Sequence, residues 1–509
     1  MSGYTPIPQV TQSGQSNIGA LFYASAQSNR QRIALVDGEK RYTYGELDER
    51  SNRLANYFLS KGLRSQDRVA LLANNCSECY EVFLAAAKVG VIVAALNWRL
   101  GDRELNHCVS LVEPSLIITS EDLASNIDRI DAGAPSTLII GGDYEAQLGA
   151  SDAVFPDLHI DPEAGLVILY TSGTTGLPKG ALISHRAMIA RGLQFSSFLN
   201  IPDGDTFVAW TPLYHMVAVD QGLAHLLVGS TIYVVDGFQL PKLVEILQHH
   251  SMSWFVMVPG MVGLCIGHLK KLNIKPKGVG CIGAMADLIP RAEIAAATEF
   301  FDAPFVNSFG ATETGLAPAT GNYVAIGEAP ERLPKRQSTF ADIRLVDGSD
   351  NEVPVGTPGE VSIAGPTLFS GYWNNNEANE SDFRGGRFHM GDVMRRNADG
   401  TLEYVDRVKY MIKSGGENIY PAEIESVMTL DERIETAIVV RKLDEKWGEI
   451  PVMFIVRRDE SLTDTDILSL CEKELSRYKR PKEIYFISDD DIPRSTTGKI
   501  QRHELEARL

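Results

Sequence analysis

The most informative segment of the chain is Tyr170-Thr171-Ser172-Gly173-Thr174-Thr175-Gly176-Leu177-Pro178-Lys179-Gly180, which lies between two short apolar runs. These runs, 166–169 and 181–183, predict two buried strands. The glycines let the backbone turn its amides toward an anion, the hydroxyls add donors, and the lysine adds a positive charge. The pattern therefore predicts a polyphosphate-binding loop, with the expected ligands Thr171, Ser172, Gly173, Thr174, Thr175, Gly176 and Lys179.

This loop differs from a P-loop, in which the lysine directly follows a glycine and precedes a serine or threonine. Here Leu177 and Pro178 separate Gly176 from Lys179, and Gly180 stands where the hydroxyl residue is expected. A flexible Gly/Thr turn without a ligand is the alternative interpretation. The length of the loop and its position between two predicted strands favour phosphate binding.

Outward from the loop, strand-like and helix-like segments alternate over most of the chain. Helices are predicted over 42–61 and 81–90, and strands over 68–72, 91–96, 116–119, 137–140, 231–235 and 254–258. This alternation indicates α/β layers with largely parallel sheets.

From Phe340 onward the pattern changes. Short strands over 341–346, 359–363 and 401–405 indicate a β-rich subdomain, and a smaller αβ unit follows Arg407, with a helix from Ala422, strands over 436–440 and 452–456, and a helix from Thr465. The chain is therefore expected to be α/β, with a large N-terminal domain of layered sheets and helices (1–408) and a small α+β C-terminal domain (409–509).

The composition excludes several classes of protein. At 509 residues the chain is too long for one ordinary domain, and 44% hydrophobic with 22% charged residues is a globular balance. The formal net charge of −18 argues against a general nucleic-acid or membrane-surface role, because those partners are anionic. No run reaches the ~18 apolar residues of a membrane span, and residues 1–17 lack a signal-peptide pattern. With six cysteines and one Cys76-x-x-Cys79 pair, neither a disulfide framework nor a cysteine-based metal or redox site is expected, and a reducing cytoplasm is the expected compartment.

The loop, followed by Ser184-His185, resembles the phosphate loop of the adenylate-forming superfamily, which comprises acyl-CoA synthetases, peptide-synthetase adenylation domains and luciferases. The resemblance continues in order along nearly the whole chain. Further similar motifs are Pro212-Leu-Tyr-His215, Asn307-Ser-Phe-Gly-Ala-Thr-Glu-Thr314, Gly391-Asp392, Asp406-Arg407-Val-Lys409, Lys413-Ser-Gly-Gly-Glu-Asn-Ile-Tyr-Pro421 and Pro493-Arg-Ser-Thr-Thr-Gly-Lys499. One such motif is weak evidence, but seven in register are strong evidence.

The resemblance implies a nucleotide site built from several of these motifs. Glu313 is expected to be the carboxylate for Mg²⁺-ATP, because Mg²⁺ prefers oxygen ligands and often bridges a carboxylate to phosphates. Thr312 is expected at the α-phosphate, and Phe309, where the family more often has Tyr, is expected to stack on adenine. The other implied nucleotide contacts are Gly283 and Ala284 at the adenine edge, Gly310, Asp392 at the ribose hydroxyls, and Arg407 at ribose or phosphate.

The resemblance also implies the groups that handle the acid. His215 is expected between the carboxylate site and the pantetheine channel, and Met216–Val219 and Met285 are expected to line the acyl pocket. Lys499 is expected to neutralise the charge that develops when the acid meets the α-phosphate.

The C-terminal domain is expected to be mobile and to swing about Lys409. The swing would bring Lys499 for adenylation, and then the loop of Lys413, Gly415 and Gly416 for thiolation. Met390 and Tyr410 depart from the family pattern, and Tyr410 adjoins the hinge.

These features predict an acyl-CoA ligase that uses ATP, Mg²⁺ and CoA and needs no protein nucleophile. The alternatives are an enzyme that only thiolates a preformed acyl-adenylate, and a non-catalytic acyl-AMP-binding module. The small residues of Gly310-Ala311 and Leu316–Thr320 favour a bulky aromatic or cyclic acid. The expected partners are the carboxylic acid, ATP and CoA, without nucleic acid or membrane insertion, and a homodimer is compatible with the chain.

Overall fold

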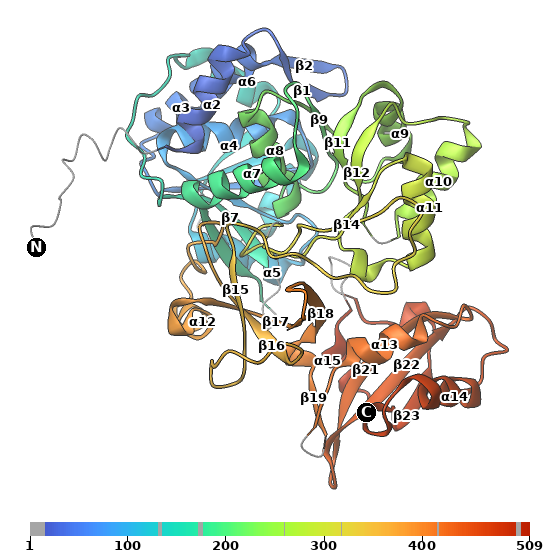
Figure 1. Cartoon of the computed structure of the whole chain (residues 1–509). Coiled ribbons are helices and arrows are strands. Elements are labelled where there is room, and N and C mark those ends of the chain that lie inside the picture. The colour runs from blue at the N-terminus through green and yellow to red at the C-terminus, as the bar shows by residue number, and fades with distance from the viewer. Residues whose placement is uncertain are drawn as a thin grey trace, which may run out of the picture. The chain divides into compact units, whose positions relative to one another are not determined.

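The computed structural model describes residues 16–509 apart from 131–134, 172–176, 259, 317, 415–416 and 495–499. The chain forms two compact units, which we call unit 1 (Met1–Asp342 and Ala364–Asp382) and unit 2 (Ile343–Ile363 and Phe383–Leu509). Figure 1 shows the elements of both units along the chain. The mixed α/β fold class, with a large N-terminal and a small C-terminal part, is confirmed. The predicted boundary at 408/409 stays a prediction, and in this structure the short strands of the β-rich segment group with unit 2.

The sheet that carries the phosphate loop has six strands in the order β6-β5-β3-β4-β7-β8. Pairing is parallel from β6 through β7, and only the edge strand β8 is antiparallel. The inner strands are almost continuously apolar, as expected for parallel strands covered on both faces. Their bounds are β3 Arg68–Leu72, β4 Ile92–Ala95, β5 Leu116–Ser120, β6 Ser136–Ile140, β7 Gly165–Thr171 and β8 Lys179–Ser184.

Two further sheets complete the strands of unit 1, in the orders β2-β1-β10-β9 and β11-β12-β13-β14. Strand β11 covers Met252–Phe255 rather than the predicted 254–258, because its partner β12 ends at Ile282, opposite Phe255. The other bounds are β1 Ile33–Asp37, β2 Lys40–Thr43, β9 Thr206–Ala209, β10 Thr231–Val234, β12 Val279–Ile282, β13 Phe305–Val306 and β14 Tyr323–Val324.

The helices of unit 1 begin at residues that suit helix starts. Thr43 forms a capping box with Glu46 at the start of α3, and Ser184, the last residue of β8, caps α7 through the Ala187 N–H. The helices are α2 Ile18–Ser28, α3 Tyr44–Ser60, α4 Ser77–Val89, α5 Asp102–Val112, α6 Gly142–Ala150, α7 His185–Leu199, α8 Met216–Leu227, α9 Leu240–His249, α10 Val262–Lys271, α11 Arg291–Phe301 and α12 Asn376–Asp382. The 3₁₀ turns are η1 Glu121–Arg129 and η2 Ala286–Leu288.

Unit 2 contains a four-stranded sheet, β15-β16-β17-β18, and a five-stranded sheet in which β21 and β22 form a long hairpin. Alternate residues of this hairpin face two cores: Val439 and Met453 pack with α13 and α14, and Ile438 and Phe454 pack with α15. The elements are β15 Asp342–Val346, β16 Pro358–Ala364, η3 Arg384–Gly386, β17 Phe388–Arg396, β18 Leu402–Arg407, η4 Val408–Tyr410, β19 Ile412–Ser414, β20 Glu417–Ile419, α13 Pro421–Met428, β21 Ile434–Asp444, β22 Gly448–Arg457, α14 Asp464–Glu474, η5 Arg477–Lys479, β23 Glu483–Phe486, η6 Asp489–Asp491 and α15 Arg502–Glu506.

A buried ammonium joins α4 to α3. The Lys88 side chain is fully buried, and its Nζ lies 2.7 Å from Asp48 Oδ1, from Ser51 Oγ and from Asn52 Oδ1. Burial lowers the pKa of Lys88 to about 8, although the Asp48 carboxylate opposes this shift. The charge is tolerated in the core because each of these acceptors is directed at it.

We expect Lys88→Met to lower the free energy of unfolding by about 3 kcal/mol or more, because the Asp48 carboxylate would stay buried without its cation. The measurement is the denaturant midpoint followed by circular dichroism. Lys61→Met, at an exposed lysine, is the matched control and should leave the midpoint near that of the wild type. An unchanged midpoint for Lys88→Met would contradict this role of the pair.

Candidate active site

The predicted phosphate loop starts and ends on paired strands. Thr171 is the last residue of β7 and lies opposite Lys179, the first residue of β8, so both ends of the loop belong to the sheet. The stem is held by α5, where Cys108 O accepts from the Tyr170 hydroxyl at 2.8 Å and His107 Nε2 lies 3.0 Å from Pro178 O. The predicted ligands Ser172, Gly173, Thr174, Thr175 and Gly176 lie outside the described residues.

Thr171 presents an unused hydrogen-bonding group at the loop. Its Oγ1 is buried and finds no partner among the residues that the structure describes. A buried hydroxyl without a partner is costly, and such groups in native proteins call for an explanation such as a ligand or water. Thr171 is therefore suited to receive a phosphate oxygen.

Lys179 has two neighbours that the sequence did not indicate. Its Nζ lies 3.2 Å from Asp382 Oδ2 at the end of α12 and 3.7 Å from the centroid of the Tyr372 ring. The ammonium is thus held between a carboxylate and the face of an aromatic ring, an arrangement that attracts a cation from both sides.

Glu313 is buried beside the same tyrosine. The Tyr372 hydroxyl donates to Glu313 Oε1 at 2.8 Å, and the Phe369 N–H donates to the Glu313 carbonyl at 2.9 Å. A tight turn precedes it: a Cβ at Gly310 would lie 2.0 Å from the Gly315 carbonyl oxygen, so only glycine fits there. One tyrosine therefore connects the predicted metal carboxylate to the predicted phosphate lysine.

A buried ion pair supports this turn from behind, and the sequence analysis missed it. Arg191 of α7 donates to Thr312 O at 3.1 Å and to Thr367 O at 2.8 Å, and its Nη1 lies 3.1 Å from Asp220 Oδ2 of α8. Burial lowers the pKa of Arg191, while the carboxylates of Asp220 and Glu313 oppose that shift. Burial also raises the pKa of Asp220. In sequence Arg191 has the appearance of an ordinary surface arginine, so no signal could have revealed the pair.

The residues expected at adenine form a second cluster in unit 1. Gly283 has a φ of 77°, and a Cβ there would meet the Phe305 ring at 2.0 Å, so the chain turns at this position only with glycine. Beyond buried Ala284, Met285 adopts a left-handed φ of 53°, and its N–H donates to Ser308 Oγ at 3.1 Å. This bond joins the 283–285 turn to the segment that leads to half-buried Phe309.

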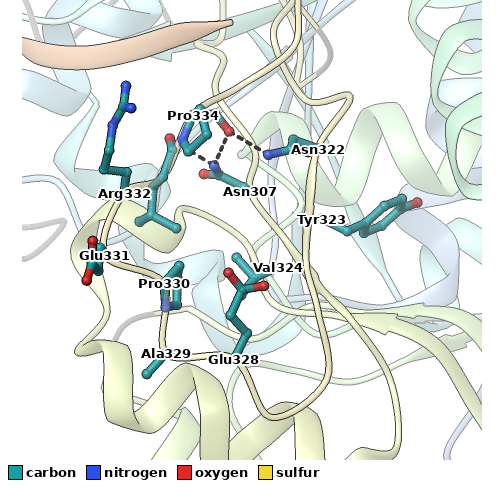
Figure 2. A pocket seen from close by; sticks show the side chains of 11 residues that line it. Asn307, Asn322, Tyr323, Val324, Glu328, Ala329, Pro330, Glu331, Arg332 and Pro334 are labelled. Atoms are coloured by element: carbon teal, nitrogen blue, oxygen red, sulfur yellow. Dashed lines mark hydrogen bonds between the residues drawn. The ribbon is translucent and has the colours of Figure 1, made fainter.

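Asn307, just after β13, has an open acceptor. Its Nδ2 donates to Leu333 O at 3.1 Å and to Pro334 O at 3.0 Å, whereas its buried Oδ1 finds no partner within the described ranges. Figure 2 shows this side chain and that of Asn322 directed at Pro334 in the wall of a pocket of about 550 Å³. The pocket is lined by Asn307, Asn322, Tyr323, Val324, Glu328, Ala329, Pro330, Glu331, Arg332, Leu333 and Pro334.

His215 stands at the start of α8, where it is half-buried, and its ring lies 4.7 Å from that of Tyr214. The turn that presents it is fixed by Asn75, whose Oδ1 accepts from Leu213 N at 2.9 Å and whose Nδ2 donates to Thr211 O at 2.8 Å. Met216–Val219 form the first turn of the same helix.

Unit 2 carries the remaining predicted residues. Asp392 of β17 is buried and pairs with Arg407 of β18 through two contacts, Nε–Oδ1 at 2.9 Å and Nη2–Oδ2 at 3.3 Å. This pair is an ion pair in the structure, and the carboxylate raises the pKa of Arg407 against the effect of burial. Lys413 is exposed on β19, and its N–H donates to Glu449 Oε2 at 2.7 Å. Gly415, Gly416 and Lys499 lie outside the described residues.

Tyr410, the departure beside the predicted hinge, lies between two cations. The Lys409 Nζ is 4.9 Å from its ring centroid, and the Arg502 guanidinium of α15 is also 4.9 Å from it. Beside it, Asp406 Oδ2 accepts from the Ala422 N–H at 2.8 Å at the start of α13, and burial raises the pKa of Asp406 to about 6. The end of β18 is thus attached to α13 through Asp406, and the segment after it to α15 through Tyr410.

The single carboxylate of Glu313 suits a metal ion that takes its remaining ligands from a substrate. Among the described residues no group of three or more His, Cys, Asp and Glu side chains could hold a metal ion alone. A Mg²⁺ ion on Glu313 would take its other ligands from phosphates and water, which is the usual pattern for Mg²⁺ at nucleotides.

Four of the buried cysteines are poor nucleophiles. Burial raises the pKa of Cys265 to about 12 and that of Cys471 to about 11, and it raises the pKa of Cys108 and Cys281 further.

Across the described part of the chain no helix is long and apolar enough to cross a membrane.

The chain is similar to known proteins over most of its length. The sequence matches the family described as AMP-binding enzyme over residues 22–373 and the AMP-binding enzyme C-terminal domain over residues 423–499. It is 30% identical over 487 residues to the indoleacetate–CoA ligase of Aromatoleum aromaticum (strain DSM 19018 / LMG 30748 / EbN1), covering 93% of this chain and 94% of that protein. It is 31% identical over 488 residues to a feruloyl-CoA synthase of Amycolatopsis sp., covering 95% and 97%.

The fold of the chain is also similar to that of a solved acyl-CoA synthetase. The structure of a Mycobacterium tuberculosis fatty acyl CoA synthetase matches with a TM-score of 0.78 and 27% identity, covering 97% of this chain and 98% of that one. The largely parallel sheet of unit 1 agrees with this relationship. The chain belongs to the AMP-binding enzyme family, among its AMP-forming acyl-CoA synthetases.

We expect Thr171→Val to weaken ATP binding by about 10-fold, the scale of one hydrogen bond to a charged group. The folded state should not lose stability, because Val keeps the shape of the side chain and removes a buried hydroxyl that has no partner among the described residues. The measurements are the ATP dissociation constant and the thermal midpoint. Thr119→Val in β5 is the matched control, since its hydroxyl donates to Ser120 O: stability should fall while ATP affinity stays. A stability loss without a change in ATP affinity for Thr171→Val would make this hydroxyl structural.

Proposed function

We propose that this chain activates a carboxylic acid with Mg²⁺-ATP and transfers the acyl group to CoA. In the first step a carboxylate oxygen attacks the α-phosphorus of ATP, and pyrophosphate leaves. In the second step the CoA sulfur attacks the acyl carbon, the thiol proton is lost, and AMP leaves with the electrons of the acyl–oxygen bond. The attacking thiol belongs to CoA, in keeping with the raised pKa of the buried Cys108, Cys265, Cys281 and Cys471.

The observation that carries this proposal is the connection of Lys179 and Glu313 through Tyr372. A lysine suits the phosphate charge, and a buried carboxylate suits the metal ion that accompanies ATP. When bound, Mg²⁺ would neutralise part of the phosphate charge. The open Oγ1 of Thr171 supports phosphate binding beside them, and the open Oδ1 of Asn307 supports contact with the amino group of adenine.

The remaining roles follow the family resemblance. Thr312 would contact the α-phosphate, Phe309 would stack on adenine against Gly283 and Ala284, and His215 would lie between the carboxylate and thiol sites. Asp392 and Arg407 would share the ribose, with Asp392 using oxygen lone pairs that its ion pair leaves over. Lys499 would act in the first step, and Lys413 with Gly415 and Gly416 would act in the second, after a swing about Lys409.

A bulky aromatic or cyclic acid is the proposed substrate class. Two relatives that match nearly the whole chain are an indoleacetate–CoA ligase and a feruloyl-CoA synthase, and both of these acids are aromatic. The small side chain of Ala311 is compatible with a bulky acid beside the Glu313 turn, whereas the space beside Gly310 is taken up by the Gly315 carbonyl. The decisive experiment incubates the protein with ATP, CoA and a panel of aromatic, cyclic and aliphatic acids, with AMP release and thioester formation as readouts.

The second candidate is an enzyme that only thiolates a supplied acyl-adenylate. The departures Phe309, Met390 and Tyr410 leave room for it, whereas Lys179, Glu313 and Lys499, all present in the sequence, argue against it and favour full ligation. A wild type that forms no acyl-AMP from any acid on the panel, but converts synthetic acyl-AMP and CoA to thioester, would establish the second candidate.

We expect Glu313→Gln to slow acyl-AMP formation by about 100-fold, the scale of losing one charge contact to the transition state. The side-chain amide keeps the shape and an acceptor for Tyr372 but removes the charge for the metal ion. The rate is measured in pyrophosphate release at several Mg²⁺ concentrations. Glu299→Gln, at an exposed glutamate, is the control and should behave as the wild type. Wild-type rates and ATP affinity in folded Glu313→Gln would exclude the assigned role.

We expect Lys499→Ala and Gly416→Leu to affect opposite steps. The first should slow acyl-AMP formation by about 100-fold and spare thiolation of synthetic acyl-AMP, because the swing has then removed Lys499. The second should spare adenylation and block thioester formation, because the leucine fills the thiol channel. Both variants are assayed on acid plus ATP and on acyl-AMP plus CoA. Equal losses in the two assays for Lys499→Ala would contradict domain alternation.

A further inference from the structure

The backbone of Tyr372 is fixed from two sides. The segment around it pairs with β8, where Ser370 N donates to Leu182 O and Trp373 N donates to Gly180 O, both at 2.7 Å. On the other side, Asn379 of α12 accepts from Tyr372 N at 2.7 Å and donates to Tyr372 O at 2.9 Å. The strand that begins with Lys179 therefore also sets the position of Tyr372.

The Tyr372 side chain is buried, and its hydroxyl and its ring each contact a charged residue. Its hydroxyl donates to Glu313 Oε1 at 2.8 Å, and its ring face lies 3.7 Å from Lys179 Nζ. The Phe369 ring packs edge-on at 4.9 Å, and Phe369 N also holds the Glu313 carbonyl, so ring and carboxylate share one support. The two charged groups are thus held by one rigid side chain.

Each contact has a directional consequence. A hydroxyl that donates to one carboxylate oxygen holds the carboxylate in one orientation and leaves the second oxygen available to a cation. A ring face attracts the ammonium without neutralising it, and Asp382, 3.2 Å from Lys179 Nζ, is the anion that a phosphate would replace.

We propose that Tyr372 is a positioning residue for Mg²⁺-ATP: its hydroxyl orients Glu313 for the metal ion, and its ring holds Lys179 for the phosphates. The inference rests on the proposed function, which assigns Glu313 and Lys179 to Mg²⁺-ATP. The two parts of the side chain are separable, since Phe keeps the ring and removes the hydroxyl, whereas Leu removes both.

The test measures the ATP dissociation constant by calorimetry, once with Mg²⁺ and once with EDTA, so that no acid is needed. The wild type should bind ATP more tightly with Mg²⁺. In Tyr372→Phe the dissociation constant with Mg²⁺ should rise by about 10-fold or more, while the value in EDTA stays near that of the wild type. In Tyr372→Leu both values should rise, because Lys179 loses the ring as well.

Tyr485→Phe is the matched control. The Tyr485 hydroxyl also donates to a glutamate, Glu483, at 2.6 Å, but this exposed pair lies in unit 2, and both ATP affinities should equal those of the wild type. Circular dichroism and the thermal midpoint establish that each variant is folded. If Tyr372→Leu does not fold, the nearly isosteric Tyr372→Phe still decides the role of the hydroxyl.

The inference is overturned if Tyr372→Phe keeps the wild-type gain in affinity from Mg²⁺, or if its loss is equal in EDTA. A wild type whose ATP affinity does not depend on Mg²⁺ would overturn it as well. Failure of the proposed function gives a different result: the wild type would bind Mg²⁺-ATP as expected but form no thioester with any acid. Thioester formation by the wild type together with wild-type Mg²⁺ dependence in Tyr372→Phe would overturn the positioning role alone.

Discussion

The buried carboxylate of Glu313 is the constraint on which the site in unit 1 depends, because a charge taken out of water needs donors or a cation close to it. The Tyr372 hydroxyl supplies one donor, and Arg191 contributes a positive charge from behind while it holds the Thr312 carbonyl. The hydroxyl is neutral and engages one oxygen of the carboxylate, so the carboxylate can still attract a cation through its other oxygen. A site with this balance suits a cation that arrives together with its own anion, as Mg²⁺ does with ATP.

Pairing of the edge strand β8 brings these groups together from distant parts of the sequence. Lys179 begins the strand, the segment around Tyr372 adds to its other edge, and α12 follows with Asp382, which is 203 positions from Lys179. Backbone hydrogen bonds along one strand thereby place a cation and its neighbours without any local sequence signal. These backbone hydrogen bonds fix the relative positions of Lys179 and Tyr372, because strand register determines which side chains face each other.

Unit 2 presents a different arrangement, in which charged groups satisfy one another. Asp392 and Arg407 form a two-contact pair, and the Arg502 guanidinium meets Tyr410 while it also pairs with Glu425. The Tyr410 ring therefore connects the predicted hinge residue Lys409 with Arg502 of α15. This contact gives a physical meaning to the departure at position 410, since a small or acidic residue there would lack the ring face that Arg502 and Lys409 share.

The sequence alone was enough to predict the α/β class, the family and the strands 68–72, 116–119 and 137–140, because strands of a parallel sheet are apolar runs and loop chemistry is local. The structure adds one residue to each of the last two strands, Ser120 and Ser136. It also predicted Lys179 and Glu313 as charged site residues, although their roles stay predictions. Only the tertiary structure decided that Thr171 and Lys179 are paired strand residues, that β11 ends at Phe255, and that Tyr372, Asp382, Arg191 and Asn307 belong around the site. The reason is physical: strand register and the pairing of buried charges depend on partners that are far away in sequence, and no local pattern carries that information.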